Sequence, residues 1–306
     1  MKNDSQELVS VVVPCYNHGK FIDDAVNSIL TQTYENIEII IVNDGSTDEE
    51  TNTYLETYSK PKTRVITTTN QGLPSARNNG IKEAKGKYIL PLDADDKIHP
   101  EYIEKALKII KEDENIGIVY GKTEFFGDKS GVWELPAYSL EEMLLRNLII
   151  TCSMFKKSDW EKVGGYSKDM VYGFEDHDFW LSLLELGREV RFIPEVMFYY
   201  RKVNTETTRP HSIAQITSSS EKVLYSFNML VKHHPELYKQ HVAFIMMMLK
   251  SIEIEKDTVA LNLLHRDNAI KDLHTINYDL KQKLEQEIEN KKFGALVKKV
   301  RKSLKL

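Results

Sequence analysis

The sequence predicts an α/β fold, in which a mostly parallel sheet is flanked by helices and followed by a helical C-terminal extension. Two observations support this class. Short apolar, β-branched runs alternate with segments whose apolar residues recur at helical spacing, which is typical of βαβ units. Acidic residues follow two predicted strands directly, at Asp44 and at 93–96. Because parallel strands end at one edge of a sheet, we expect these acids to share a cleft.

The first third of the chain contains four predicted strands, which cover residues 9–14, 37–42 and 64–69 and a run from Tyr88. The segments between them are predicted helices. Apolar residues recur at helical spacing over 21–30, and Ser46–Glu49 has the spacing of a capping box. Pro74 suits the first turn of a helix that runs to about Ala84, and Pro100 opens a strongly periodic helix to about Ile110. This alternation predicts a Rossmann-like sheet.

Beyond residue 116 the alternation becomes irregular. Strands are predicted over 116–126 and 148–155, and a late strand or strand pair over 188–201. Capping-box spacings at Ser139–Glu142 and Ser158–Glu161 each predict a short helix. Three further acids, at Glu175, Asp176 and Asp178, begin a predicted helix that Gly187 would close.

The composition is that of an ordinary soluble protein of 306 residues with a formal net charge of −5. Seven Lys or Arg and no acid lie in residues 291–306, which leaves about −12 on residues 1–290 and predicts no nucleic-acid binding outside this tail. Cys15 and Cys152 are far apart and form no metal-type cluster, which favours a reducing cytosol. The polar start predicts no signal peptide, and apolar runs are too short to cross a bilayer.

From about residue 212 onward the sequence predicts helix alone. One apolar stripe indicates a packing face or a short helical hairpin, through which two copies could form a homodimer: Leu273, Ile276, Leu280, Leu284 and Ile288. Residues 291–306 predict a basic amphipathic helix. It would lie on an anionic membrane surface or dock on the protein's own body, so we expect a cytoplasmic protein that can associate peripherally with the inner face of the membrane.

The acid clusters leave two interpretations open at this point. Asp93, Asp95 and Asp96 could form an acidic surface turn, or they could hold a hard divalent cation shared with a substrate phosphate. Likewise, Glu175 and Asp176 could simply complement a helix dipole, or they could carry chemistry.

Five segments, in order and at similar spacing, resemble the family 2 glycosyltransferases. They cover residues 9–17 (VSVVVPCYN), 41–48 (IVNDGSTD), 70–80 (NQGLPSARNNG), 86–96 (GKYILPLDADD) and 173–181 (GFEDHDFWL). The similarity spans roughly residues 8–202. It implies a GT-A fold, a nucleotide-diphospho-sugar donor, most often a UDP-sugar, a divalent Mn²⁺ or Mg²⁺, and inverting transfer to a glycan or lipid-linked glycan in cell-surface polysaccharide or glycoconjugate synthesis.

The resemblance also implies roles for individual residues. Asp44 would accept the base N–H of the nucleotide, with Pro14, Tyr16 and Asn17 beside it. Arg77 would lie near the nucleotide or its diphosphate. Asp93 and Asp95 correspond to the DxD pair, with Asp95 as the direct metal ligand and Asp96 in reserve, while Asp176, after Glu175, would be the general base. The implied catalytic domain covers residues 1–211, with a nucleotide-sugar half over about 8–100 and an acceptor half over about 101–211; a helical region over 212–290 and the tail over 291–306 follow.

The chain departs from the family pattern at one position. Many members have a histidine just after the late Tyr-Arg, where it can help to hold the metal, but here Val203 follows Lys202, and His211 is the nearest substitute. Two alternatives have weaker support. A phosphatase with an Asp-x-Asp nucleophile would place it near the start of its domain, and a non-catalytic binding subunit would not require Asp95 or Asp176.

Overall fold

The computed structural model describes residues 7–203 and 220–248 and single positions between 250 and 286. The chain divides into two compact units, residues 1–242 and 243–306. In the second unit the described positions are helical. The predicted stripe from Leu273 to Ile288, the tail over 291–306 and His211 lie outside the described residues. Within the described part, no helix has the length and apolar content needed to span a bilayer.

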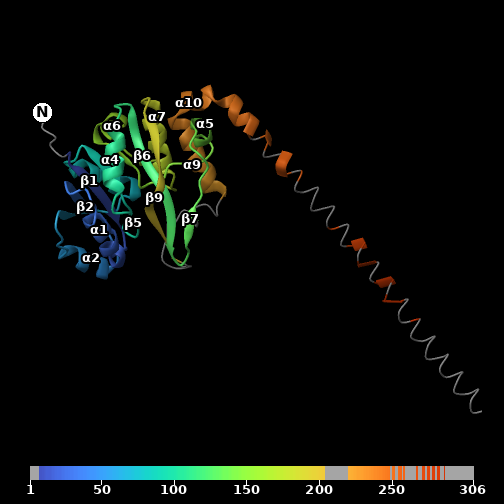
Figure 1. The fold of residues 1–306 in the computed structure, drawn as a ribbon, viewed down its shortest axis with the longest axis horizontal. Coiled ribbons are helices and arrows are strands. Elements are labelled where there is room, and N and C mark those ends of the chain that lie inside the picture. Colours follow the sequence, from blue (N-terminus) through green and yellow to red (C-terminus); the bar gives the residue numbers. More distant parts are fainter. Residues whose placement is uncertain are drawn as a thin grey trace, which may run out of the picture. The chain divides into compact units, whose positions relative to one another are not determined.

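The described part of the first unit is built on a nine-stranded mixed sheet in the order β3-β2-β1-β4-β8-β6-β9-β5, with β7 paired to β6 (Figure 1). The strands are β1 (Val9–Cys15), β2 (Ile37–Asp44), β3 (Thr63–Thr68), β4 (Tyr88–Pro91), β5 (Lys97–Ile98), β6 (Ile116–Gly127), β7 (Gly131–Trp133), β8 (Met154–Lys156) and β9 (Glu189–Lys202). Strands β1 to β4 are mutually parallel, as are β6 and β9, whereas β8 is antiparallel to both β4 and β6.

Helices flank this sheet. They are η1 (Gly19–Phe21), α1 (Ile22–Leu30), α2 (Glu49–Glu56), α3 (Leu73–Glu83), α4 (Tyr102–Ile110), α5 (Leu140–Met143), α6 (Lys157–Val163), α7 (Glu175–Glu185), α9 (Ser220–His233) and α10 (Pro235–Gln240). The α/β class and the mostly parallel sheet predicted from the sequence are therefore confirmed.

The core lies between the central strands and their helices. Every residue of β1 and β2 is buried, as expected for Val- and Ile-rich strands covered on both faces. Helix α3 packs closely on both strands because Gly80 has no side chain there. A Cβ added to Gly80 would lie 2.4 Å from Cγ1 of Val12 and 2.9 Å from Cγ2 of Val42. This close approach holds α3 near the carboxyl ends of β1 and β2.

Three local predictions were wrong in detail. The cap of α2 is Asp48, whose Oδ2 accepts from the Thr51 amide, while the hydroxyl of Ser46 accepts from the Asn17 amide. Ser158 lies inside α6 rather than capping it. The strand predicted over 148–155 is limited to β8, since a turn in which the Ser153 amide donates to the Thr151 carbonyl interrupts it. The capping box at Ser139 is confirmed by its bond from the Glu142 amide.

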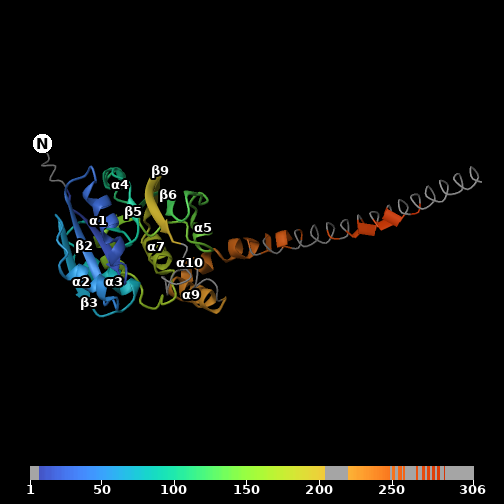
Figure 2. The same ribbon diagram turned by 90° about the horizontal axis from the view of Figure 1, so that it is seen from below.

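Helices α9 and α10 lie beside α7 in both views (Figures 1 and 2). Two adjacent histidines join α9 to α7. His233 Nδ1 is 2.7 Å from an Asp178 oxygen, and His234 lies between Asp178 (3.3 Å) and Glu185 (2.8 Å). Burial by itself would lower the pKa of His234, but the two carboxylates outweigh it, so the pKa is raised. The protonated imidazole therefore ties the two helices together.

We expect the stability contributed by His234 to depend on pH. Its folded pKa lies above the unfolded value of about 6.5, so the contribution is complete below about pH 6.5 and is lost as the pH rises through the folded pKa. The Tm difference between wild type and His234→Gln should be largest near about pH 6 and shrink toward alkaline pH. His241→Gln is the control, because His241 bonds only a backbone carbonyl, that of Leu237, among the contacts described. A Tm difference for His234→Gln that is the same at every pH would contradict the assignment.

Candidate active site

The acids predicted to meet lie at the carboxyl edge of the sheet. Asp44 ends β2, and Asp93 and Asp95 follow β4 directly. Asp95 also lies near the end of β1, because its charge contributes, after burial, to raising the pKa of Cys15 to about 11. Asp176 begins α7. In open α/β sheets, ligands usually bind just beyond the carboxyl ends of the parallel strands, which is where these acids lie.

Asp44 lies at the amino end of α3. Its carboxylate is 3% exposed and accepts from the Thr68 hydroxyl at 3.1 Å and from the Gly72 amide at 3.0 Å. The Gln71 amide is also directed at it. The backbone N–H groups at the start of a helix have no partner within the helix and can donate to such an oxygen. The carboxylate is therefore held in a fixed direction.

Arg77 joins two acids that are far apart in the sequence. From α3 it donates Nη1 to Glu175 Oε1 at 2.5 Å and Nη2 to Asp93 Oδ1 at 2.8 Å. The guanidinium also lies over the Tyr166 ring, 5.6 Å from its centroid. The side chain of Arg77 is 1% exposed, whereas that of Asp93 is 32% exposed. The prediction that Arg77 meets the diphosphate itself stays a prediction, since the contacts described are with acids and an aromatic ring.

The charges of this cluster depend on one another. Burial alone would lower the pKa of Arg77, but the charges of Asp93 and Glu175 outweigh it and the pKa is raised. Burial raises the pKa of Glu175, and Arg77 partly offsets that rise. The positive charge of the Arg77 guanidinium thus offsets the cost of burying the Glu175 carboxylate beside Asp176.

Asp176 lies next to Glu175, and its carboxylate is held by two donors. Oδ2 accepts from the Thr151 hydroxyl at 2.6 Å, and Oδ1 accepts from the His177 amide at 2.8 Å. The residue is 9% exposed. His177 is turned away from it, with Nε2 bonded to the Met143 carbonyl, and burial lowers its pKa. His177 therefore anchors α5 to α7 rather than facing the acids.

Arg201 of β9 holds the turn that carries the acids after β4. Its amide donates to Asp96 Oδ1 at 2.8 Å, and its Nε donates to the Asp95 carbonyl at 2.7 Å. The guanidinium lies between the Phe21 and Phe126 rings, 4.7 and 4.3 Å from their centroids, and bonds Asp24. Asp96 is 1% exposed, and its contact with the Arg201 amide indicates a structural role.

The sequence resemblance implies a ligand made of UDP and Mn²⁺. On that expectation, Arg201→Ala should weaken binding of this ligand about tenfold or more, because the bond that fixes the Asp95 carbonyl is lost and a bond to a charged group is worth about 1.5–3 kcal/mol. Isothermal titration calorimetry measures this. Arg191→Ala is the control on the same strand, because Arg191 pairs with Glu189 at its amino end. Unchanged UDP affinity in a folded Arg201→Ala chain would contradict the positioning role.

Asn17 connects the first two loops of this edge. It has a left-handed backbone (φ 57°), and its Oδ1 accepts from the Thr47 and Asp48 amides at 2.8 and 2.9 Å. Pro14 is buried in β1, and Tyr16 is half-buried in the loop that follows it. Asn17 thus holds the loop after β1 against the loop after β2. A direct contact of Pro14, Tyr16 or Asn17 with a nucleotide stays a prediction.

The metal predicted at Asp93 and Asp95 stays a prediction. Asp93 and Asp95 supply oxygen donors of the kind that Mg²⁺ and Mn²⁺ take when phosphate oxygens and water complete the coordination. Across residues 7–203, 220–248 and the single positions beyond, no three His, Cys, Asp or Glu side chains form a group that could hold a metal alone.

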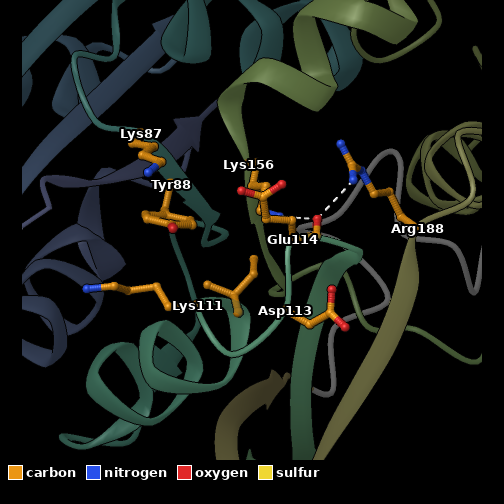
Figure 3. Close-up of a pocket in the computed structure, with 8 residues that line it drawn as sticks. Lys87, Tyr88, Lys111, Asp113, Glu114, Lys156 and Arg188 are labelled. Carbon is orange, nitrogen blue, oxygen red and sulfur yellow. Dashed lines mark hydrogen bonds between the residues drawn. The ribbon is translucent and has the colours of Figure 1, made fainter.

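A separate cavity of about 380 Å³ lies at the amino end of β4 (Figure 3). Lys156 and Arg188 both donate to the Glu114 carbonyl at its wall. Its other lining residues are Lys87, Tyr88, Ile110, Lys111 and Asp113. The amino end of a parallel strand lies opposite its carboxyl end, so this cavity is distinct from the acids described above.

Three residues of the site were not predicted as such. Thr151 has no sequence pattern that marks it, because its bond to Asp176 depends on an irregular segment. Tyr166 follows two glycines that indicated only a turn. Arg201 lies in the Tyr-Arg-Lys segment that was considered only for a following histidine.

Solved structures with a similar fold are glycosyltransferases of the GT-A type. Staphylococcus aureus TarS in complex with UDP-GlcNAc has a TM-score of 0.56 and 19% identity, covering 77% of this chain and 73% of that one. The mannosyltransferase PcManGT of Pyrobaculum calidifontis, solved with GDP-Man and Mn²⁺, has a TM-score of 0.54 and 19% identity, covering 75% and 69%. The predicted GT-A fold is confirmed by these likenesses.

Sequence comparison identifies the family. Residues 10–177 match the Glycosyl transferase family 2, and the chain belongs to this family. An uncharacterized glycosyltransferase of Haemophilus influenzae is 28% identical over 91% of this chain and 87% of its own length, and one of Rickettsia typhi is 36% identical over 68% of each. The chondroitin synthase of Pasteurella multocida is 31% identical over 59% of this chain but only 19% of its own length. The chain is thus a nucleotide-sugar glycosyltransferase.

Proposed function

We propose that this chain transfers a sugar with inversion from a UDP-sugar to a hydroxyl of a glycan or lipid-linked glycan, in cell-surface polysaccharide or glycoconjugate synthesis. The observation that carries the proposal is the Arg77 bridge. It joins Asp93, which follows a central strand, to Glu175, which precedes Asp176. This bridge supports one shared site, in which Asp93 would face a metal–diphosphate and Asp176 would face the acceptor hydroxyl.

The chemistry assigns different work to the two groups of acids. A cation held by Asp95 and Asp93 would stabilise the negative charge that develops on the departing diphosphate. Asp176 would take the proton of the acceptor hydroxyl as it attacks the sugar carbon opposite the leaving group. The Thr151 hydroxyl and the His177 amide, which both donate to the Asp176 carboxylate, would hold it in a fixed orientation toward the acceptor. Asp44 would accept the base N–H of the nucleotide.

Calorimetry with UDP-sugars, with and without Mn²⁺, tests the donor half of this proposal. Wild type should bind with Mn²⁺ and much more weakly without it, and Asp95→Asn should abolish the difference. Asp113→Asn, at the amino edge of the sheet, is the matched control. Binding that is equally tight without metal, or unchanged in Asp95→Asn, would refute the proposed role of Asp95. GDP-sugars and dTDP-sugars on the same samples test the choice of nucleotide.

We also propose that residues 291–306 attach the chain peripherally to an anionic membrane. The support is the run of seven cationic side chains on a predicted amphipathic helix. Deletion of 291–306 should abolish sedimentation with phosphatidylglycerol vesicles, since each cation near such a surface contributes about 1 kcal/mol. Vesicles of neutral phosphatidylcholine are the control. Equal sedimentation of the full and shortened chains would contradict the proposal.

A further inference from the structure

Three aromatic side chains stack at the carboxyl ends of β6 and β9. The Trp133 ring is 5.5 Å from the Phe125 ring with 23° between their planes, and 6.2 Å from the Tyr200 ring with 25°. Phe125 and Tyr200 are cross-strand partners of the β6–β9 ladder, and Trp133 comes from β7 on the other edge of β6. We call Phe125, Trp133 and Tyr200, with Lys129 and Lys202 beside them, the Trp133 platform.

The platform is more open than its folding role requires. Phe125 is 8% exposed and with Tyr200 makes the aromatic cross-strand pair that stabilises a ladder. Trp133 is 40% exposed. Two cations border the rings: Lys129 Nζ lies 4.3 Å from the Phe125 centroid, and Lys202 Nζ lies 4.3 Å from the Tyr200 centroid. An open aromatic ring with cations at its border is a surface suited to an amphipathic anion.

The platform adjoins the acids of the site. Arg201, which holds the Asp95–Asp96 turn, lies between Tyr200 and Lys202 in β9. Its side chain contacts Phe21 and Asp24, next to α1.

The platform shares an edge of the sheet with the acids that follow β4. Strand β8 is antiparallel to both β4 and β6, and β9 is parallel to β6, so β4, β6 and β9 all run in one direction. The platform, at the carboxyl ends of β6 and β9, therefore lies at the same edge as Asp93 and Asp95.

We propose that the Trp133 platform binds the acceptor, and that the acceptor is a glycan carrying carboxylate or phosphate groups. This inference rests on the proposed transfer to a glycan hydroxyl. The apolar C–H face of a sugar ring would pack on Trp133, and the acidic groups would pair with Lys129 and Lys202. Residues 1–290 carry about −12, so an anionic polymer would be repelled elsewhere and attracted here by local cations.

Intrinsic fluorescence can report binding at this position. The chain contains three tryptophans, of which Trp180 is 0% exposed, Trp160 is half-buried and Trp133 is exposed. The full chain is titrated with oligosaccharides of matched length: hyaluronan, which carries carboxylates, phosphorylated maltodextrin, which carries phosphates, and neutral maltodextrin. Fluorescence change with one of the two anionic probes, weakening with added salt and absent with maltodextrin, is the expected result. Which anionic probe binds distinguishes carboxylate from phosphate.

Calorimetry with the probe that binds then tests the residues. Trp133→Ala and the double variant Lys129→Ala/Lys202→Ala should each weaken binding tenfold or more, while Trp133→Phe should retain most of it. Phe192→Ala, an exposed aromatic at the other end of β9, and Lys108→Ala, an exposed lysine of α4, are the controls and should bind as wild type does. Circular dichroism verifies that each variant is folded.

Three results would overturn the proposal: no binding of any probe, equal binding of the neutral probe, or unchanged affinity in folded Trp133→Ala. UDP and Mn²⁺ binding, measured on the same samples, keeps the two questions separate. A chain that binds UDP but no anionic glycan refutes the acceptor class alone, whereas a chain that binds no nucleotide refutes the proposed donor site.

Discussion

Replacing Asp176 by Asn should lower kcat about 10²–10⁴-fold, because an amide cannot take the proton of the acceptor hydroxyl and general bases supply about this factor. The Asn side chain is nearly isosteric and can still accept from Thr151, so the fold and the donor affinity should stay close to wild type. Steady-state transfer rates measure kcat, and calorimetry with the UDP-sugar measures donor binding. Turnover at the wild-type rate would remove Asp176 from the mechanism.

Asp178→Asn is the matched control for this experiment. It makes the same chemical change two residues further along α7, at a carboxylate that pairs with His233 and His234 instead of facing the acids. We expect it to lower Tm and to leave kcat within a few-fold of wild type. Equal losses of kcat in both variants would show that the helix, and not the Asp176 carboxylate, was disturbed.

Replacing Arg77 by Met should destabilise the chain by about 3–5 kcal/mol, the cost of removing one partner from a buried ion pair. Glu175 would remain buried at 7% exposure without its cation, next to Asp176. Since burial already raises the pKa of Glu175, the loss of Arg77 raises it further. The variant can then fold with Glu175 protonated, so the destabilisation should shrink as the pH falls. Urea unfolding at several pH values measures both effects.

Two companion variants separate the charge effect from lost packing. Arg77→Met/Glu175→Gln should recover part of the stability and lose the pH dependence, because the unpaired charge is gone. Arg64→Met is the control, since Arg64 pairs with Glu38 but is 36% exposed, and it should cost less. An Arg77→Met chain whose stability loss is the same at all pH values, or which the second substitution does not relieve, would contradict this account.

The fold class and the positions of most acids could be predicted from local patterns in the sequence. Apolar runs of strand length, spaced by helical periods, predict a parallel sheet, and acids that follow such runs must lie at its carboxyl edge. This pattern correctly predicted that Asp44, Asp93 and Asp95 lie at one edge of the sheet. Helix caps were less predictable, since Asp48, and not Ser46, caps α2. The Ser46 hydroxyl instead accepts from the Asn17 amide of a neighbouring loop, and local spacing does not predict this contact.

The contacts that connect the distant acids could not be predicted from local patterns. The bond from Arg77 to Glu175 links residues 98 positions apart, and that from Arg201 to Asp96 links residues 105 apart. The position of Thr151 depends on an irregular segment, and that of Trp133 on the pairing of β7 with β6. These contacts follow from sheet order and packing, which bring together side chains that no local spacing relates. Periodicity reports which face of an element is buried, but not which other element covers it.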